Sequence, residues 1–421
     1  MQLSANKFIN LKTIASRLEV TKLFGFALTL STLLLPAHVH ALGIRIADQD
    51  PFAMGRGEAF AATADNPSAI YYNPAGITQI DGINARVGGY GILLNDHYSN
   101  DAFHSEVNTR QKLQGIPQLY VTGTCPDYPV SLGLGVYMPY GFGLEWPANA
   151  PFTVLPTVPK KGQIEYLTIN PVVAIKPHKT LSISAGPTFN HGETELEFTP
   201  GGEPNSFKFH GRDDDVGFNA GILWQPLEKH SFGIAYRSAT TMNFKGHSDL
   251  HIPILSANVS GQIASANFAF PQNVVFGYSF RPCTNWNFEI NADWTDWHRL
   301  NTVTLNNQFT GPSNIPLDWQ NSWFYEFGAT RYFDNAWRLS FGYIYSQNSV
   351  PSATFNPAVP DSDRHIFSVG VGQTYKHLSW DAAYQFAWGP DRDINNGVGN
   401  PINGTYRFIS HALAVSVGYH F

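Results

Sequence analysis

Ser416-Val417-Gly418-Tyr419-His420-Phe421 closes an alternating segment that begins near Tyr406 and stops on an aromatic residue. Successive side chains of a β-strand point to opposite faces, so the large residues gather on one face: Leu413, Val415, Val417, Tyr419 and Phe421. The other face carries mostly small residues: Ala412, Ala414, Ser416, Gly418 and His420. A strand whose large apolar face meets lipid has this pattern, so the segment predicts the final strand of a transmembrane β-barrel.

The same alternation recurs from about residue 82 onward. Apolar side chains occupy every second position over most of Trp286–Trp294, Trp337–Tyr345 and Leu378–Trp388. About six short turns separate these segments from one another, together with about seven longer connections such as 199–212, which predicts about 14 antiparallel strands. One strand cannot distinguish a barrel from a soluble sandwich, but the strand count and the unequal connections favour an all-β transmembrane barrel over residues 82–421.

The first 41 residues predict a secretory signal peptide. Basic residues precede an apolar run and small residues follow it, in the order Lys7, Lys12, Arg17, Lys22, then Leu23–Leu35, then Val39 and Ala41. The apolar run is shorter than the about 20 residues that a spanning helix needs. We therefore expect cleavage after Ala41 and a mature chain in the bacterial cell envelope.

Charge and aromatic content narrow the function classes. The formal net charge is −6, and removing residues 1–41 makes it more negative, because that segment carries four basic residues and one acidic residue. An acidic chain is not expected to bind nucleic acid. The chain has 10 Trp, 19 Tyr and 30 Phe. Many aromatic residues without a long apolar helix are typical of barrels with aromatic girdles at the membrane interfaces.

Residues 42–81 differ in character from the barrel segments. Small residues accumulate around Gly55-Arg56-Gly57-Glu58-Ala59, and Tyr71-Tyr72-Asn73-Pro74-Ala75-Gly76 follows Asp65-Asn66-Pro67-Ser68. This composition favours short helices and turns over a lipid-facing strand. The segment is either a periplasmic tail or a folded plug inside the barrel lumen, and its apolar content favours the plug.

Several motifs in order resemble the FadL/TodX family of outer-membrane transporters of long-chain fatty acids and other hydrophobic compounds. They are Asn73-Pro74-Ala75, Pro139-Tyr140-Gly141-Phe142-Gly143-Leu144, Tyr236-Arg237-Ser238, Trp294-Thr295-Asp296-Trp297, and Val350-Pro351 with Pro360-Asp361-Ser362-Asp363-Arg364. The resemblance covers about Leu42 to Phe421. It implies a 14-stranded barrel in the bacterial outer membrane with an N-terminal hatch of short helices.

The resemblance also implies candidate site residues. Asn73, Pro74 and Ala75 would form the signature turn of the hatch, at 42–81. The third strand, near Val130–Pro139, would leave a lateral opening in the wall, with Gly133, Gly135 and Gly141 as bend points, since glycine is expected where a strand bends. Apolar Phe142, Leu144 and Trp146, in a segment expected outside the membrane, would either capture substrate or pack against one another to cap the barrel.

The sequence determines the class of substrate less well than it determines the transport route. Arg237 and Arg338 fall on polar strand faces and are candidates for holding a carboxylate head group in the lumen. The loop predicted over 306–321 contains no Lys or Arg, which raises the chance of a neutral substrate. We therefore expect passive transport of long-chain fatty acids, with neutral aromatic hydrocarbons as the alternative, by a monomer in contact with outer-membrane lipid.

Other functions fit the sequence less well. A porin for polar solutes is the second alternative, although residues 42–81 would block a wide pore. No local motif fixes a nucleophile beside a base, so we do not expect an enzyme. We expect no cofactor and no metal. Cys125 and Cys283 lie in turns that belong to distant strand pairs, which disfavours a disulfide between them.

Overall fold

The computed structural model describes residues 44–111 and 113–421. The predicted signal peptide, 1–41, lies outside the described residues. The described residues belong to one compact unit, which consists of a barrel wall with a leading segment, 44–81.

The wall is built from antiparallel β-strands. In chain order they are β1 (Ile83–Asn100), β2 (Ser105–Asn108), β3 (Gln114–Thr124), β4 (Val130–Glu145), β5 (Lys161–His178), β6 (Leu181–Phe198), β7 (Ser206–Leu227), β8 (His230–Arg237), β9 (Thr240–Ile252), β10 (Ala257–Phe270), β11 (Asn273–Cys283), β12 (Trp286–Thr295), β13 (Thr302–Asn307), β14 (Gly311–Pro316), β15 (Ser322–Tyr332), β16 (Trp337–Ser346), β17 (Arg364–Tyr375), β18 (Leu378–Trp388), β19 (Arg392–Ile394) and β20 (Gly404–His420).

These segments form a closed barrel of 14 strands, as predicted. Some barrel strands are interrupted and carry two labels, as where β8 and β9 both pair with β7. Pairing of β1 with β20, from Asn84 opposite His420 to Ser99 opposite Thr405, closes the ring. The lipid-facing pattern is confirmed in β20, where Leu413, Val415 and Val417 are 58%, 53% and 47% exposed.

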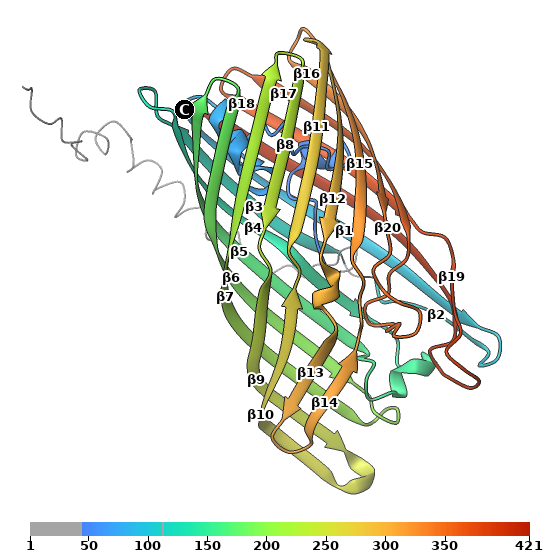
Figure 1. The fold of residues 1–421 in the computed structure, drawn as a ribbon. Coiled ribbons are helices and arrows are strands. Elements are labelled where there is room, and N and C mark those ends of the chain that lie inside the picture. Colours follow the sequence, from blue (N-terminus) through green and yellow to red (C-terminus); the bar gives the residue numbers. More distant parts are fainter. Residues whose placement is uncertain (1–43, 112) are drawn as a thin grey trace, which may run out of the picture. The chain divides into compact units, whose positions relative to one another are not determined.

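The two ends of the barrel carry different connections (Figure 1). Short turns such as those joining β5 to β6 and β17 to β18 lie at the end where the chain terminates, and the longer connections lie at the opposite end. In bacterial barrels the short turns are periplasmic and the long loops external. We use these names for the two ends.

Several wall strands extend further outward than the sequence suggested. The predicted third strand, 130–139, is β4 and continues to Glu145; β7 begins at Ser206, inside the connection predicted over 199–212; and the loop predicted over 306–321 contains β14. These predictions were wrong because the outer parts of the strands carry polar or irregular sequence that resembles loop sequence, while hydrogen bonding to neighbouring strands keeps them extended.

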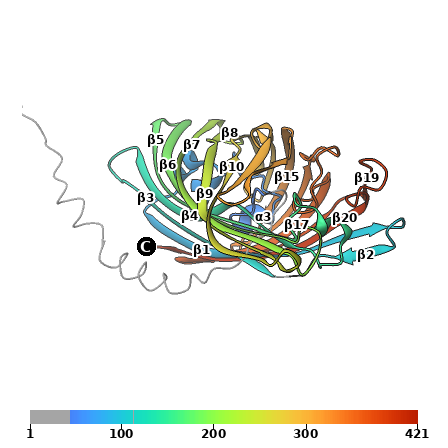
Figure 2. The ribbon, with the colours of Figure 1, turned by 90° about the horizontal axis from the view of Figure 1, so that it is seen from below.

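The leading segment contains the short helices α3 (Pro51–Met54) and α4 (Ala69–Tyr72) and the 3-10 helix η2 (Pro74–Gln79). The external connections add η3 (Pro151–Val154), η4 (Pro253–Leu255) and η5 (Trp297–Arg299). Seen along the barrel, the leading segment lies within the ring of strands (Figure 2). Every residue from 44 to 64 is buried.

Candidate transport site

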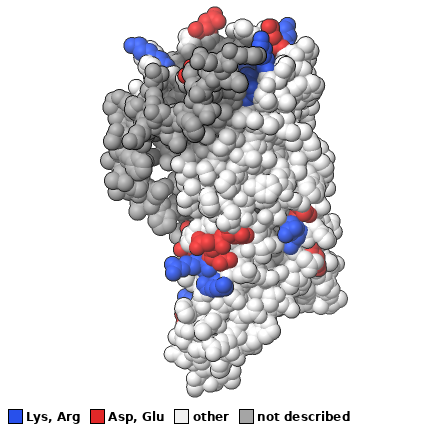
Figure 3. All heavy atoms as spheres, turned by 60° about the vertical axis from the view of Figure 1, so that its left-hand side comes forward, with Lys and Arg blue, Asp and Glu red and all other residues white. Residues whose placement is uncertain are grey.

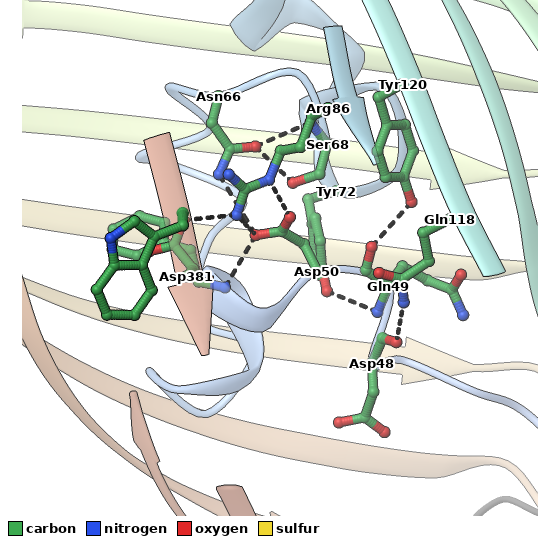
Figure 4. Close-up of polar contacts among 12 residues, drawn as sticks. Asp48, Gln49, Asp50, Asn66, Ser68, Tyr72, Arg86, Gln118, Tyr120 and Asp381 are labelled. Atoms are coloured by element: carbon green, nitrogen blue, oxygen red, sulfur yellow. Dashed lines mark hydrogen bonds and ion pairs between the residues drawn. The ribbon is translucent and has the colours of Figure 1, made fainter. Parts of the chain in front are cut away.

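Charged residues of the leading segment bind the barrel wall. Asp50 caps α3 by accepting a hydrogen bond from the amide of Phe52 at 2.9 Å, and its carboxylate also pairs with Arg86 of β1. Arg86 bonds Asp381 of β18 as well, at 2.7 Å. Nearby, Tyr120 of β3 donates to the carbonyl of Gln49 at 3.0 Å (Figure 4). Since buried charges are costly unless paired, this network favours the position in which the segment is seen.

A second charged contact joins the segment to β12. Glu289 accepts a hydrogen bond from the amide of Ala62 at 2.7 Å and another from the hydroxyl of Thr63. Arg56, fully buried, lies 3.5 Å from the same carboxylate. The polar partners of the Glu289 carboxylate therefore come mainly from the leading segment.

Asn73, Pro74 and Ala75 lie at the start of η2. The Asn73 side chain accepts a hydrogen bond from the amide of Ala75 at 3.2 Å, and Pro74 occupies the first turn, where the proline has no amide hydrogen to lose. Nδ2 of Asn73 donates to the carbonyl of Ala61 at 2.7 Å and to that of Ile222, on β7, at 3.0 Å. One side chain thus caps a helix and ties the segment to the wall.

The ladder between β3 and β4 is incomplete. β3 pairs with β1 from Gln114 onward, but its pairing with β4 extends only over 119–124. On the other side of β4, the register against β5 shifts between Tyr137 and Tyr140. Pro139 lies at this shift and has no amide hydrogen for a ladder bond. Residues 114–118 of β3 therefore have no backbone partner on β4 in the described structure.

The beginning of the leading segment occupies this part of β4. The amide of Ile46 donates to the carbonyl of Pro139, and the amide of Gly141 donates to the carbonyl of Ile44, both at 2.9 Å. Arg45 and Tyr140 form the antiparallel bridge between them. Arg45 also pairs with Asp293 and donates to Thr295 at 2.9 Å, both on β12. Residues 44–46 thus complete part of the ladder that β3 leaves open.

The three candidate glycines lie in two different environments on β4. Gly133 and Gly135 lie within the paired part of β4, where added Cβ atoms would come within 2.9 and 2.8 Å of the Ile70 side chain. They therefore permit close packing of the leading segment. Gly141 lies beside the irregularity and pairs with Glu165. Their part in a lateral opening stays a prediction.

Phe142, Leu144 and Trp146 belong to a large buried cluster at the external end. Phe142 and Leu144 lie on β4 itself, and Trp146, fully buried, donates to the carbonyl of Pro357 at 2.7 Å. Phe142 also lines an apolar cavity of about 60 Å³, together with Ile44, Phe244 and Phe268. The aromatic residues pack against one another, and Ile44 connects their cavity to the irregular part of β4.

Arg237, at the end of β8, is buried beside the leading segment. Its guanidinium donates to the hydroxyl of Tyr137 at 2.9 Å and the carbonyl of Tyr71 at 3.3 Å, and it lies 4.5 Å from the ring centre of Tyr71. In the part of the chain that the structure describes, Arg237 makes no ion pair with a carboxylate. It lines a polar cavity of about 30 Å³ that also contains Arg45 and Glu58.

Glu58 belongs to the leading segment and not to a strand. Burial raises the pKa of its carboxyl well above the usual range, and the neighbouring Asp48 carboxyl adds to the effect. The hydroxyl of Tyr72 donates to Glu58 at 2.6 Å. A raised pKa favours the protonated form of Glu58, which would lessen the negative charge of the cavity beside Arg237.

Arg338 has a different environment. It donates two hydrogen bonds of 2.7 Å to Asp381, the carboxylate that also bonds Arg86. This carboxylate is its ion-pair partner. Arg338 therefore belongs to the ion network that holds the leading segment. The sequence analysis missed Asp50, Arg86 and Asp381, since no local motif connects residues so far apart in the chain.

Two further features concern metal and cysteine chemistry. Among the described residues, no cluster of three His, Cys, Asp or Glu side chains is arranged to hold a metal ion. Cys125 and Cys283 are both free. A search of the described helices for one long and apolar enough to cross a membrane finds none.

The closed barrel, the buried leading segment and the interrupted wall define a class: a transmembrane β-barrel filled by its own N-terminal part. The chain belongs to the family of outer membrane protein transport proteins, OMPP1/FadL/TodX, whose model matches residues 32–421. The protein is thus an outer-membrane protein of a family that transports hydrophobic compounds.

Relatives cover the chain to different extents. An outer membrane protein of Neisseria meningitidis is 23% identical, over 94% of this chain and 97% of its own length. The long-chain fatty acid transport protein of Escherichia coli is 26% identical, but over only 50% of this chain and 49% of its own. The chain therefore matches about half the length of that transporter.

Solved structures support the fold. A Pseudomonas aeruginosa FadL homologue superposes with a TM-score of 0.78, at 20% identity, over 90% of this chain and 100% of that one. The Pseudomonas putida toluene transporter TodX gives a TM-score of 0.73 at 13% identity, with the same coverage. At these identities the similarity shows the fold alone.

Proposed function

We propose that the protein moves long-chain fatty acids passively across the outer membrane by external capture, rearrangement of residues 44–81 as a hatch, and lateral exit between β3 and β4. The observation that carries this proposal is the incomplete β3–β4 ladder, bridged by residues 44–46. Displacing those residues would remove the backbone partners that Pro139, Tyr140 and Gly141 of β4 have in residues 44–46.

Capture would take place at the external apolar cluster. Each buried CH₂ group contributes about 0.8 kcal/mol, so a long alkyl chain gains enough to enter without an energy source. The cavity lined by Phe142, Phe244 and Phe268 offers a starting point. It would have to widen, since about 60 Å³ is much less than the about 300 Å³ at which ligand sites begin.

Release would require residues 44–46 to leave β4. The contacts to be broken include two backbone hydrogen bonds, the Arg45–Asp293 ion pair and the hydrogen bond from Arg45 to Thr295. Backbone bonds contribute only about 0.5–1.5 kcal/mol each, whereas breaking a buried ion pair costs about 3–5 kcal/mol. The ion pair is therefore the main resistance to opening. A ligand that binds only the open form would shift the balance by its differential affinity.

Arg237 favours a substrate that carries a carboxylate. In the described structure its guanidinium donates to one hydroxyl and one carbonyl and makes no ion pair, so it retains hydrogen-bonding capacity for an anion, and charge-assisted hydrogen bonds contribute about 1.5–3 kcal/mol. The named relatives include transporters of fatty acids and of toluene, so neutral aromatic hydrocarbons are the alternative substrate.

Uptake in a Gram-negative host that lacks its own transporter tests both substrates. Labelled oleate and labelled toluene would be supplied to cells with verified surface expression of the chain. Oleate uptake above the empty host supports the proposal. Uptake of toluene alone would replace the fatty acid with a neutral substrate, and uptake of neither would exclude both.

A further inference from the structure

The outer surface of the barrel changes from apolar to charged toward its external end. On β7, Val216 and Phe218 are 61% and 50% exposed, and the outward positions that precede them toward the external end are Asp214, Arg212 and His210. Figure 3 shows acidic and basic side chains gathered in a band beyond a broad surface that carries neither. In a barrel with external long loops, this border marks the head-group level of the outer leaflet.

Four side chains on β7 and β9 form a block on the outward face, which we call the basic quartet. On adjacent strands Arg212 lies directly opposite Lys245, and His210 directly opposite His247. All four are exposed. Directly opposite residues have Cβ atoms about 4.5–5.5 Å apart, so two positive charges at one such pair destabilise the sheet unless an anion lies between them.

The carboxylates around the quartet have other partners. Glu195 pairs with Lys161 at 2.7 Å, and Asp214 pairs with His191 at 2.7 Å. Glu193, which lies opposite Arg212 on β6, is 3.4 Å from His191. In residues 44–111 and 113–421, no carboxylate lies within ion-pair distance of Arg212 or Lys245.

The remaining acidic side chains near the quartet accept hydrogen bonds from backbone amides. Asp213 accepts from the amide of Asn243 at 2.7 Å, Asp215 from that of Thr241 at 2.6 Å, and Asp249 from that of Gly261 at 2.9 Å. Asp213 and Asp215 replace ladder bonds where β7 and β9 lose their regular pairing, beyond Arg212, and Asp249 does so at the irregularity between β9 and β10. Among the described residues, Arg212 and Lys245 therefore make no ion pair with a carboxylate, although Glu193 lies opposite Arg212 on the neighbouring strand.

We propose that the basic quartet binds the phosphate of a phosphorylated glycolipid in the outer leaflet, with Arg212 and Lys245 as the principal contacts. Phosphate oxygens accept several charge-assisted hydrogen bonds, and the guanidinium of Arg212 can bind two of them in a fork. The acyl chains of the same lipid would lie on Val216 and Phe218. This site faces the membrane, so it is separate from the transport route through the lumen.

The test compares purified wild-type protein in detergent with the R212Q/K245Q variant and with the matched control K208Q. Lys208 is an exposed neighbour on β7 that already pairs with Glu197 at 3.4 Å. Native mass spectrometry would measure binding of three probes: bisphosphorylated lipid A, its dephosphorylated form, and inorganic phosphate. We expect R212Q/K245Q to bind the phosphorylated lipid at least tenfold more weakly, with K208Q within twofold of wild type.

Three results would overturn the proposal. They are equal binding of the dephosphorylated lipid, inorganic phosphate as effective as the lipid, or unchanged binding by R212Q/K245Q. Since the two substitutions remove facing like charges at exposed positions, the variant should unfold at the wild-type temperature or above it. Lost lipid binding with that unfolding temperature therefore supports the site.

Discussion

At the scale of residues, Asn73 combines two roles that substitution can separate. Asn73→Ala removes both the cap of η2 and the bonds to Ala61 and Ile222. Asn73→Asp keeps the cap acceptor but loses the amide donors. If attachment to the wall is what matters for the hatch, both variants should slow oleate uptake several-fold while the barrel stays folded. Slow uptake in Asn73→Ala with normal uptake in Asn73→Asp would assign the effect to the cap alone.

Arg237 and Arg338 offer a matched comparison at the same scale. Arg237→Gln should lower oleate uptake at least tenfold and leave toluene uptake unchanged, because only oleate would use the charge. Arg338→Gln should affect both substrates alike, since Arg338 supports the leading segment through Asp381. Equal effects of Arg237→Gln on the two substrates would rule out Arg237 as a head-group ligand.

At the scale of elements, period-2 patterning predicted the barrel well because lipid and lumen place opposite demands on alternate side chains. It predicted outer strand ends poorly, as in β7, where Lys208, His210 and Arg212 face outward in a polar layer and resemble a loop. The contacts of the leading segment were also inaccessible to sequence reasoning. Asp50 and Asp381 share one arginine although they are 331 positions apart in the chain, and no local pattern encodes that contact.

The bridge between residues 44–46 and β4 can be locked covalently. Arg45 and Tyr140 face each other as a non-hydrogen-bonded antiparallel pair, whose Cα atoms lie about 4.5 Å apart, within the range for a disulfide. In a background with Cys125→Ser and Cys283→Ser, the pair Arg45→Cys and Tyr140→Cys should block oleate uptake when oxidised. Reduction should restore it. The single cysteine variants control for loss of the native side chains, and uptake that is independent of redox state would show that this segment need not move.

At the scale of the whole molecule, we expect the ion network around Arg86 to decide whether the barrel conducts. Wild-type protein in planar bilayers should carry only rare, brief currents, because residues 44–81 fill the lumen. A steady, large conductance would instead support the porin alternative.

Asp50→Asn should raise the conductance above that of the wild type. Asparagine retains the capping acceptor for α3 but removes the charge that pairs with Arg86. Breaking one partner of a buried pair costs about 3–5 kcal/mol, although Asp381 remains beside Arg86 and reduces the loss. If the closed form is strongly favoured, a loss of only about 1.4 kcal/mol in its stability would increase the population of open channels tenfold.

Asp334→Asn, in the exposed turn between β15 and β16, is the control and should conduct like wild type. If Asp50→Asn leaks no more than this control, the network stabilises the leading segment without keeping the lumen closed, and the resistance to opening must lie at Arg45 and β4.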